Sequence, residues 1–594
     1  MKTKIYKIMC AACTTVALSS CLDTVILPDD ITVGEDFWQK KSDVSMMVNA
    51  AYQGMTTENV MERLIVWGDF RSDEMVQAGS PEGAIPNALA EVAMFSSQVT
   101  NRYATWSDFY AVINRCNIVL EKAADVLAAD PNYTEGDYLT DRSQMLALRS
   151  LCYFYLVRNF RDVPYVDEAY MTSSKERTFV QAPPAEVLQH CIESLEEAAA
   201  NAIKAEGYSD SDWRRVGWFT FDGINSLLAD IYLWRASVLH SAEDYQKAVE
   251  CCDKVIASKK AMHKQSASET FVQEYPLARA RNAYEELFVT QNAEESIFEL
   301  QVKANPALCK YLYKFANNNS TEGFLKASNI FSKDDNIANI TTAVGAKVFP
   351  VNDMRYFSTI FSATANDESF NIRKMISNNA ITSLTAQPRA TVSRTYADID
   401  QNYIIYRLPD VMLMKAEALV QLADTAMAGL SDEEKTTKQA AVDLQLRQAF
   451  NLVQAVNTRS LLDDNKGDSI KWDNLRTMGR TGKTGMELLV MEERLRELCF
   501  EGKRWYDLLR YNYRHVSGVN YSSIMGDQGL SALPANSNEF LDVTTRGKAN
   551  ASGLKAKMAN EAYLYLPIPN SDAVLATQLK QNPAYGSTNQ FERK

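Results

Sequence analysis

Apolar residues recur at intervals of three and four over most of the first 260 residues, and the same pattern returns between about 401 and 512. This spacing places apolar side chains on one face of a helix, so it predicts a succession of amphipathic helices. The longest uninterrupted stretch, 486–513, predicts a single helix of roughly 40 Å. The other predicted helices are 43–55, 103–124, 142–160, 183–202, 219–240, 244–256, 403–422 and 444–459.

The polar face of 486–513 is dense with charges of both signs at helical spacing. Ion pairs on an exposed surface, each worth about 0.2–0.5 kcal/mol, are expected for Glu492 with Arg496, Arg494 with Glu497, Glu501 with Arg504, and Lys503 with Asp507. Arginines within one turn keep Glu497 and Glu501 ionised, whereas a general acid needs the opposite environment. These two glutamates therefore suit a structural helix better than a catalytic site. Gly502 lies on the apolar stripe and predicts that a neighbour packs close to its backbone.

Two helix pairs, 219–240 with 244–256 and 403–422 with 444–459, carry small residues where the helices would cross. This pattern resembles the tetratricopeptide repeat, although unrelated helical hairpins would produce a similar one. The expected fold class is mainly α, a tetratricopeptide-like helical-hairpin scaffold with long loop and short-strand insertions. The scaffold is expected over 36–260 and 401–512, the insertions over 262–400 and 513–562, strand-like pieces at 296–302 and 346–351, and a long surface loop at 75–100.

The N-terminus has the pattern of a targeting segment. Lys2, Lys4 and Lys7 precede a short apolar run, and 18–21 reads Leu-Ser-Ser-Cys, which is typical of a lipoprotein cleavage site. We therefore expect 1–20 to be a signal peptide, Cys21 to carry the lipid, 21–35 to be a tether, and 36–594 to be a single domain. The alternative is a plain secretory signal with an incidental cysteine.

Composition narrows the function classes. The chain has 594 residues and a net charge of −13, and it lacks a run of Lys and Arg, so nucleic-acid binding is not expected. Its 8 Trp and 28 Tyr exceed what packing alone calls for, and such side chains suit sugar faces or protein interfaces. The seven cysteines that follow Cys21 cannot all pair with one another, and Cys152 and Cys499 fall within apolar helical patterns, as small buried residues do.

The motifs of catalysis and metal binding are incomplete. The glycine-rich stretch 479–485 lacks the first glycine of a phosphate-binding loop, because Thr477 stands there. Asp463, Asn465 and Asp468 resemble a calcium loop, but Asn474 stands where its glutamate belongs. The chain has four histidines without metal-binding spacing, and it has no GxSxG motif. We therefore expect no catalytic residue, no metal and no cofactor.

Several segments carry a family resemblance. Residues 493–512 read ERLRELCFEGKRWYDLLRYN, 148–164 end in NFRDVP, 406–411 read YRLPDV, and the C-terminal part contains LPIP at 566–569 and QNPAY at 581–585. Together they resemble the SusD/RagB family of outer-membrane lipoproteins. Arg161 stands where that family usually has glycine, which leaves the turn there open. The residues identified as the family's structural motif are Arg494, Glu497, Glu501, Gly502 and Trp505.

The resemblance implies a non-catalytic, lipid-anchored protein on the outer face of the outer membrane. It would capture glycan oligomers and deliver them to a TonB-dependent, SusC-like transporter. The ligand residues expected from the family's loops are Arg71, Asp73 and Tyr103, with Tyr275, Tyr311 and Tyr356 as aromatic platforms. The alternatives are a peptide-binding member of the family, a surface glycoside hydrolase, and a repeat scaffold that binds only proteins.

Overall fold

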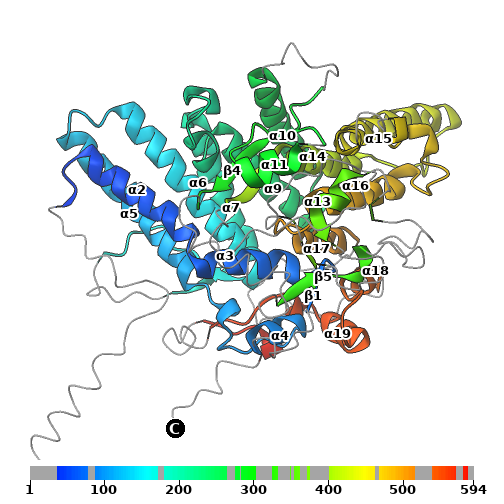
Figure 1. Ribbon diagram of the computed structural model, residues 1–594, viewed down its shortest axis with the longest axis horizontal. Coiled ribbons are helices and arrows are strands. Elements are labelled where there is room, and N and C mark those ends of the chain that lie inside the picture. The colour runs from blue at the N-terminus through cyan, green and yellow to red at the C-terminus, as the bar shows by residue number, and fades with distance from the viewer. Residues whose placement is uncertain are drawn as a thin grey trace, which may run out of the picture.

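The long helices of this chain pack against one another in sequence order (Figure 1). The computed structural model describes residues 37–77, 87–171, 179–263, 274–280, 282–302, 324–331, 348–349, 353–361, 371–372, 374, 401–461, 467–515, 538–569 and 579–585. The long helices are α2 (Lys41–Met55), α5 (Ser107–Ala129), α6 (Glu135–Phe160), α7 (Pro184–Asn201), α9 (Phe221–Leu239), α10 (Ala242–Met262), α14 (Leu408–Leu422), α15 (Asp432–Ser460), α16 (Gly482–Leu498) and α17 (Arg504–His515).

These helices form one continuous array. Helix α2 packs on α5, α5 on α6, α6 on α7, α7 on α9, α9 on α10, and α10 on α14, which in turn contacts α15 and α16. In Figure 1 the array runs from α2 and α5 at the left to α15 and α16 at the right, with α17 beneath its centre. The predicted pairs appear as α9 with α10 and α14 with α15. The expected mainly α fold class is confirmed.

Local sequence explains where several helices begin and end. At the start of α6, the Thr134 side chain accepts from the Asp137 backbone N–H, and the Asp137 carboxylate accepts from the Thr134 backbone N–H. Helix α7 begins after Pro183 with proline in its first turn. Helix α6 ends at Arg161, whose φ of +68° is the left-handed conformation that glycine favours. The turn therefore forms although arginine has replaced the usual glycine.

Short elements fill the spaces around the array. The strands pair in twos, antiparallel: β1 (Met75–Gln77) with β5 (Leu325–Ala327), β2 (Val163–Pro164) with β3 (Gln181–Ala182), β4 (Ser296–Leu300) with β8 (Tyr403–Arg407), and β6 (Ile360–Phe361) with β7 (Asn371–Ile372). The short helices include α3 (Glu58–Ile65), the π-helix η2 (Val66–Phe70), α4 (Asn87–Ala93), η3 (Arg102–Ala104), η4 (Ala205–Gly207), α8 (Arg214–Gly217), α11 (Ala283–Glu285), η5 (Glu286–Thr290), η7 (Asn329–Phe331), α13 (Met354–Thr359), η9 (Trp472–Asn474), α18 (Asn538–Thr544), α19 (Ala551–Met558), η11 (Glu561–Leu564) and η12 (Pro583–Tyr585).

Four local predictions concern strands, a helix start and a loop. The strand predicted at 296–302 is confirmed as β4. Residues 403–407 were predicted to be helical but form β8, because this run of aromatic and β-branched residues pairs with β4 before α14 begins. The predicted loop 75–100 contains β1 and α4, so that prediction was wrong in part. The strand-like piece predicted at 346–351 falls mostly outside the described residues.

The single helix predicted for 486–513 is two helices, α16 and α17, joined by a turn. Phe500 and Gly502 break the helix with φ values of +62° and +74°. A Cβ atom on Gly68 of η2 would come within 2.2 Å of the Gly502 carbonyl oxygen. The close approach predicted at Gly502 is thus confirmed, but it occurs between two backbones at a turn and not along a helix face.

The four surface ion pairs predicted for this segment are wrong, because both helices are buried. The Glu492 carboxylate pairs with Arg480, Arg494 pairs with Asp410 and Asp507, and Lys503 pairs with Asp410. These charges lie inside the protein, where breaking one partner of a pair costs far more than it does at the surface.

Two buried carboxylates hold the turn between α16 and α17. The Gly502 backbone N–H donates to Asp69 Oδ2 at 2.8 Å, and the Phe500 N–H donates to Glu74 Oε2 at 3.0 Å. Burial, with a smaller contribution from the nearby Glu501 carboxylate, raises the pKa of Asp69 to about 7, although the Gly502 N–H and Lys374 oppose the shift. Burial likewise raises the pKa of Glu74 well above its usual value.

The raised pKa values of Asp69 and Glu74 predict that the stability of the protein depends on pH. Because the folded pKa of Asp69 lies above the unfolded value near 4, the folded state binds its proton more tightly, and stability falls as pH rises through the window from about 4 to 7. Asp69→Asn keeps an acceptor for Gly502 without the charge. We expect it to raise the thermal midpoint at pH 7 and to change it little at pH 5, with about 1.4 kcal/mol at stake per pKa unit. Equal effects of the substitution at both pH values would contradict this assignment.

Candidate functional site

The ligand residues expected near the first helices are internal. The side chain of Arg71 is buried, donates to the Leu564 carbonyl, and lies over the Trp505 ring at 4.4 Å from its centroid. Asp73 is fully buried and forms an ion pair of 2.9 Å with Arg504. Both side chains contact the start of α17 in this structure. Their predicted role in ligand binding stays a prediction.

The structure describes the side chains of only two of the four tyrosines expected at the ligand site, Tyr103 and Tyr275. Tyr103 is buried beside α5, and its carbonyl accepts from Trp67 Nε1. Tyr275 is half-buried, and Lys260 of α10 lies over its ring at 4.1 Å. Tyr311 and Cys21 lie outside the described residues; Tyr356 lies in α13, but its side chain is not described. The proposed roles of these three residues stay predictions.

The family-motif residues form part of the core. Arg407 of β8 binds Glu295, Glu497 and Glu501, and Glu497 also accepts from Arg355 and Arg459. Burial favours the neutral form of Glu497, but Arg459, Arg407 and Arg355 outweigh it and hold the pKa of this carboxyl well below its usual range. The Glu501 pKa is also lowered, because Arg407 and Lys374 outweigh its burial. Both glutamates are thus buried in ion pairs, as a structural role requires, but their partners come from distant segments and not from within one turn of the helix.

A cleft of about 460 Å³ opens on another part of the array, and we call it the aromatic cleft. Its walls come from α2, from the segment around α8, from the loop before β4 and from the end of β4. The lining residues are Asn49, Tyr52, Gln53, Thr56, Trp213, Gly217, Trp218, Asn292, Leu300 and Gln301. Asn49 and Gln53 are four residues apart on α2, so they present amides on the same exposed face of that helix.

Aromatic rings form one wall of this cleft. Trp213 is 44% exposed, which is unusual for so large an apolar side chain. Its ring meets Trp218 edge to face at 6.0 Å, and Trp218 in turn stacks on Tyr52 at 6.2 Å. The Trp218 Nε1 atom is buried and has no hydrogen-bond partner among the described residues.

The local sequence explains how the exposed tryptophan is presented. The Asp212 carboxylate accepts hydrogen bonds from the Arg214 backbone N–H, at 2.9 Å, and from the Arg214 guanidinium. These bonds fix the start of α8. Gly217 lies against the Trp213 ring and the Gln301 side chain, and a Cβ atom there would come within 2.6 Å of each. Glycine is therefore required for these two cleft residues to approach each other.

Amide side chains form the opposite part of the cleft. Gln301 Nε2 donates to Asn292 Oδ1 at 2.8 Å. Asn292 and the preceding Gln291 have φ values of +51° and +65°, so the backbone is held in a conformation that residues other than glycine rarely adopt. Such backbone outliers cluster at functional sites.

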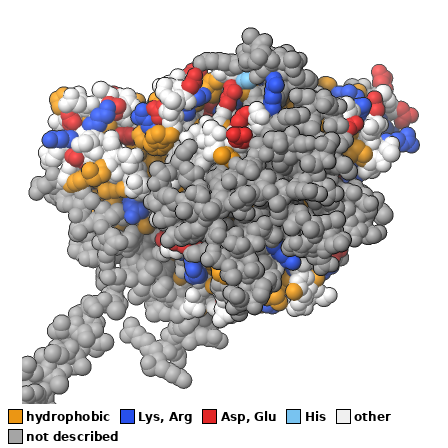
Figure 2. Space-filling model, viewed as in Figure 1, with side chains coloured by type: hydrophobic (Ala, Val, Ile, Leu, Met, Phe, Trp, Pro, Cys, Tyr) orange, Lys and Arg blue, Asp and Glu red, His pale blue; other side chains and the backbone are white. Residues whose placement is uncertain are grey.

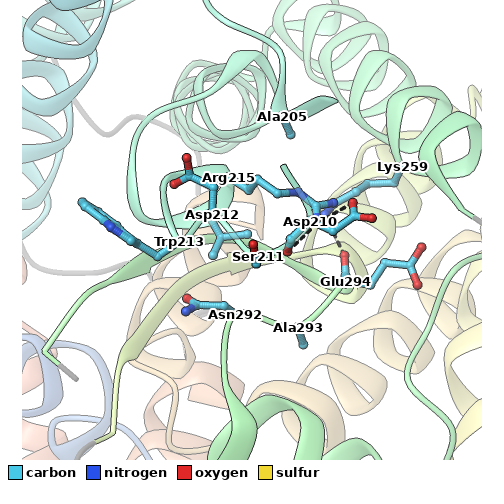
Figure 3. A pocket seen from close by; sticks show the side chains of 11 residues that line it. Ala205, Asp210, Ser211, Asp212, Trp213, Arg215, Lys259, Asn292, Ala293 and Glu294 are labelled. Carbon is cyan, nitrogen blue, oxygen red and sulfur yellow. Dashed lines mark hydrogen bonds and ion pairs between the residues drawn. The ribbon is translucent and has the colours of Figure 1, made fainter. Parts of the chain in front are cut away.

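A smaller charged pocket adjoins the aromatic cleft and shares Trp213 and Asn292 with it. Figure 3 shows Arg215, Asp210, Lys259 and Glu294 gathered on one side, while the Trp213 indole points away from them. Arg215 pairs with Asp210 at 3.2 Å, and Lys259 Nζ donates to the carbonyls of Glu294 and Ser296. The pocket holds about 30 Å³, room for about one water molecule, so it is too small for a sugar ring.

Among the described residues that line the aromatic cleft, none is Asp, Glu, Lys, Arg or His. Among the described residues, no cluster of His, Cys, Asp or Glu is arranged to hold a metal ion. No helix of the described chain has both the length and the apolar character needed to cross a membrane.

The six described cysteines, Cys499 among them, are buried and unpaired. On the face in Figure 2, acidic and basic side chains of the described residues are interspersed.

Sequence reasoning missed the aromatic cleft, although a signal was present. Trp213 and Trp218 stand five residues apart in the segment 209–218, SDSDWRRVGW, which is otherwise mostly polar. Tryptophan in a polar connection between two predicted helices has no helix face to pack on, and it therefore points to a surface role. The contributions of Asn49, Asn292 and Gln301 could not be found this way, because only the fold brings them together.

Two family models match this sequence. A model described as "SusD family" matches residues 355–585, and one described as "Starch-binding associating with outer membrane" matches residues 30–233. A curated relative, SusD-like protein P38 of Formosa agariphila, is 24% identical over 522 residues, which cover 83% of this chain and 89% of the relative.

Solved structures agree with these matches. A SusD superfamily protein from Bacteroides thetaiotaomicron superimposes with a TM-score of 0.60 at 18% identity, covering 92% of this chain and 99% of that one. A protein described as a laminarin-binding SusD-like protein superimposes with a TM-score of 0.58 at 19% identity, covering 92% of this chain and 100% of that one. At these identities the superpositions establish the fold.

Proposed function

The chain belongs to the SusD/RagB family, and on this premise we propose that its aromatic cleft captures glycan oligomers for a partner TonB-dependent, SusC-like transporter. The observation that carries the proposal is Trp213, a large exposed ring at the mouth of a cleft lined with amides. The apolar face of a sugar ring stacks on such an aromatic, and its hydroxyls exchange hydrogen bonds with amide groups. The likeness to a laminarin-binding protein supports the ligand class.

The chemistry of the lining favours an uncharged glycan. A carboxylate or sulfate group is bound best by an Arg or Lys side chain, and neither occurs among the described lining residues. The two arginines that follow Trp213 in the sequence are engaged, Arg214 by Asp212 and Arg215 by Asp210. The net charge of −13 would also repel a polyanion. We therefore take neutral oligosaccharides, such as those derived from laminarin or starch, as the ligand class.

Binding without cleavage is the simpler role for this cleft. A glycoside hydrolase needs a pair of carboxylates on either side of the scissile bond, and the part of the cleft lining that the structure describes holds no Asp or Glu. We propose that Cys21 carries the lipid that anchors the protein in the outer membrane. The anchored protein then lies on the exterior side of that membrane. Metabolic labelling with palmitate tests the anchor, since a Cys21→Ala variant that still takes up label would rule it out. Co-purification of a large outer-membrane protein with this chain tests the proposed partnership with a transporter.

The cleft predicts the result of a binding experiment with soluble protein that starts after Cys21. Trp213→Ala removes the exposed stacking surface, and we expect it to weaken binding of laminarin oligosaccharides by roughly tenfold or more, or about 1.4 kcal/mol. Isothermal titration calorimetry measures this effect. Trp472→Ala is the matched control, since Trp472 is a half-buried tryptophan on η9 that packs against Phe450, and it should leave the affinity unchanged.

Three outcomes of that titration would count against the proposal. Equal affinity of the wild type and of Trp213→Ala would remove the cleft as the site. Tighter binding of an anionic oligosaccharide, such as one from alginate, would contradict the neutral ligand class. Saturable binding of peptides, with none of neutral glycans, would assign this chain to the peptide-binding alternative.

A further inference from the structure

A buried asparagine lies directly behind the amide wall of the aromatic cleft. Asn402, at the start of β8, is 1% exposed and is not among the residues that line the cleft. Its Oδ1 accepts from the Val302 backbone N–H at 3.0 Å, and its Nδ2 donates to Glu299 Oε2 at 3.0 Å. A backbone N–H can only donate, so it must face the amide oxygen, and the amide nitrogen is left for the carboxyl group. The orientation of the Asn402 side chain is therefore fixed from behind.

This fixed amide controls the orientation of the two amides in front of it. Asn402 Nδ2 faces Gln301 Oε1 at 3.1 Å and Asn292 Oδ1 at 3.4 Å. Because Gln301 Nε2 also donates to Asn292 Oδ1, the Asn292 oxygen is turned inward and its Nδ2 group is the end left for the cleft. In Figure 3 the Asn292 side chain extends toward the side on which Trp213 lies.

Asn402 also holds the backbone that carries Asn292. Its own backbone N–H donates to Gln291 Oε1 at 2.8 Å. Gln291 and Asn292 both have positive φ values, and a conformation of this kind is strained at a residue such as Gln291. It persists only where surrounding contacts impose it. In this part of the chain, the imposed conformation presents Asn292 to the cleft.

We propose that Asn402 is a positioning residue for glycan binding, which orients Asn292 and Gln301 so that the cleft presents fixed hydrogen-bond donors to the sugar. Asn402 itself touches no ligand. The consequence is selectivity, because a rigid donor accepts only those sugars whose oxygens lie within its reach and direction. Flexible amides would accept epimers about equally well. This inference rests on the proposed function of the aromatic cleft.

A double-mutant cycle tests the proposal, with laminarin oligosaccharides as the probe. We expect Asn402→Ala and Asn292→Ala each to weaken binding about tenfold, and we expect the double variant to bind no more weakly than Asn292→Ala alone. This non-additivity is the signature of a residue that acts through its neighbour. If the two losses multiply in the double variant, Asn402 acts by another route and the proposal is overturned.

A second variant guards against a general loss of structure. Asn402→Asp keeps the size of the side chain and the acceptor for Val302, and it loses the donor toward Glu299, Asn292 and Gln301. We expect it to weaken binding at pH 8 and to recover affinity at lower pH, because a protonated carboxyl group regains a donor. The change in wild-type affinity over the same pH range serves as the reference. An affinity that does not depend on pH beyond this reference would overturn the proposal.

A crystal structure of the unliganded Asn402→Ala variant separates this proposal from the function on which it rests. We expect the Asn292 amide to leave its position, while Gln291 keeps its positive φ because the backbone N–H of residue 402 still donates to it. Unchanged Asn292 geometry would overturn the positioning role, whatever the protein binds. If Asn292 moves as expected while the wild type binds no neutral glycan, the positioning role holds and the proposed ligand is wrong.

Discussion

Gly68→Ala should destabilise this protein by about 3 kcal/mol or more, although it adds only one methyl group. The new Cβ atom would come within 2.2 Å of the Gly502 carbonyl oxygen and within 2.6 Å of its Cα atom. Both neighbours are backbone, so no side chain can rotate away. The turn between α16 and α17 would have to move, and with it the hydrogen bond from Gly502 to Asp69.

The measurement is the thermal midpoint, followed by near-UV circular dichroism, together with the yield of soluble protein. Gly136→Ala is the matched control, because Gly136 is exposed in the first turn of α6 and its nearest atom to an added Cβ is 3.9 Å away. Alanine is the better helix former, so the control should be neutral or slightly stabilising. A Gly68→Ala protein as stable as the control would show that the two backbones are not in contact.

Glu497→Gln should cost about 3–5 kcal/mol, because it removes the negative charge shared by three buried arginines. Arg355, Arg407 and Arg459 all bind this carboxylate, and all are nearly inaccessible to solvent. Glutamine has nearly the same shape, so lost packing cannot explain the effect. For a chain of this length, a loss of this size corresponds to a fall of roughly 3 °C in the thermal midpoint.

The matched control for this charge is Glu197→Gln. Glu197 pairs with Arg142 on the surface, where its side chain is 46% exposed. Exposed pairs of this kind contribute about 0–1 kcal/mol, so the midpoint should hardly change. If both glutamine variants melted alike, the ion network would contribute little to stability and the motif of α16 would need another explanation.

The helices could be predicted because burial of one face sets the period of apolar residues. The prediction 142–160 began late, since the first turns of α6, from Glu135, are exposed and carry no apolar stripe. The break between α16 and α17 could not be predicted from local pattern, because the period continues through it. It depends on Asp69 and Glu74, which lie more than 400 residues earlier in the chain.

The partners of the charged residues could not be predicted from local sequence either. The sequence predicted that arginines within one turn keep Glu497 and Glu501 ionised, whereas their partners lie outside the motif. It could not indicate which arginine each one binds, since Arg407 comes from a strand about 90 residues away. The burial of Arg71 and Asp73 could not be predicted for the same reason, since their partners are distant in sequence.

A crystal structure of the protein with a bound laminarin oligosaccharide tests the central claim most directly. We predict a sugar ring stacked on Trp213, with a hydroxyl oxygen within hydrogen-bond distance of Asn292 Nδ2. A second described cleft, lined in part by Tyr165 and Val180 and holding about 280 Å³, offers a site for comparison. A sugar bound there, or at any place away from Trp213, would contradict the account.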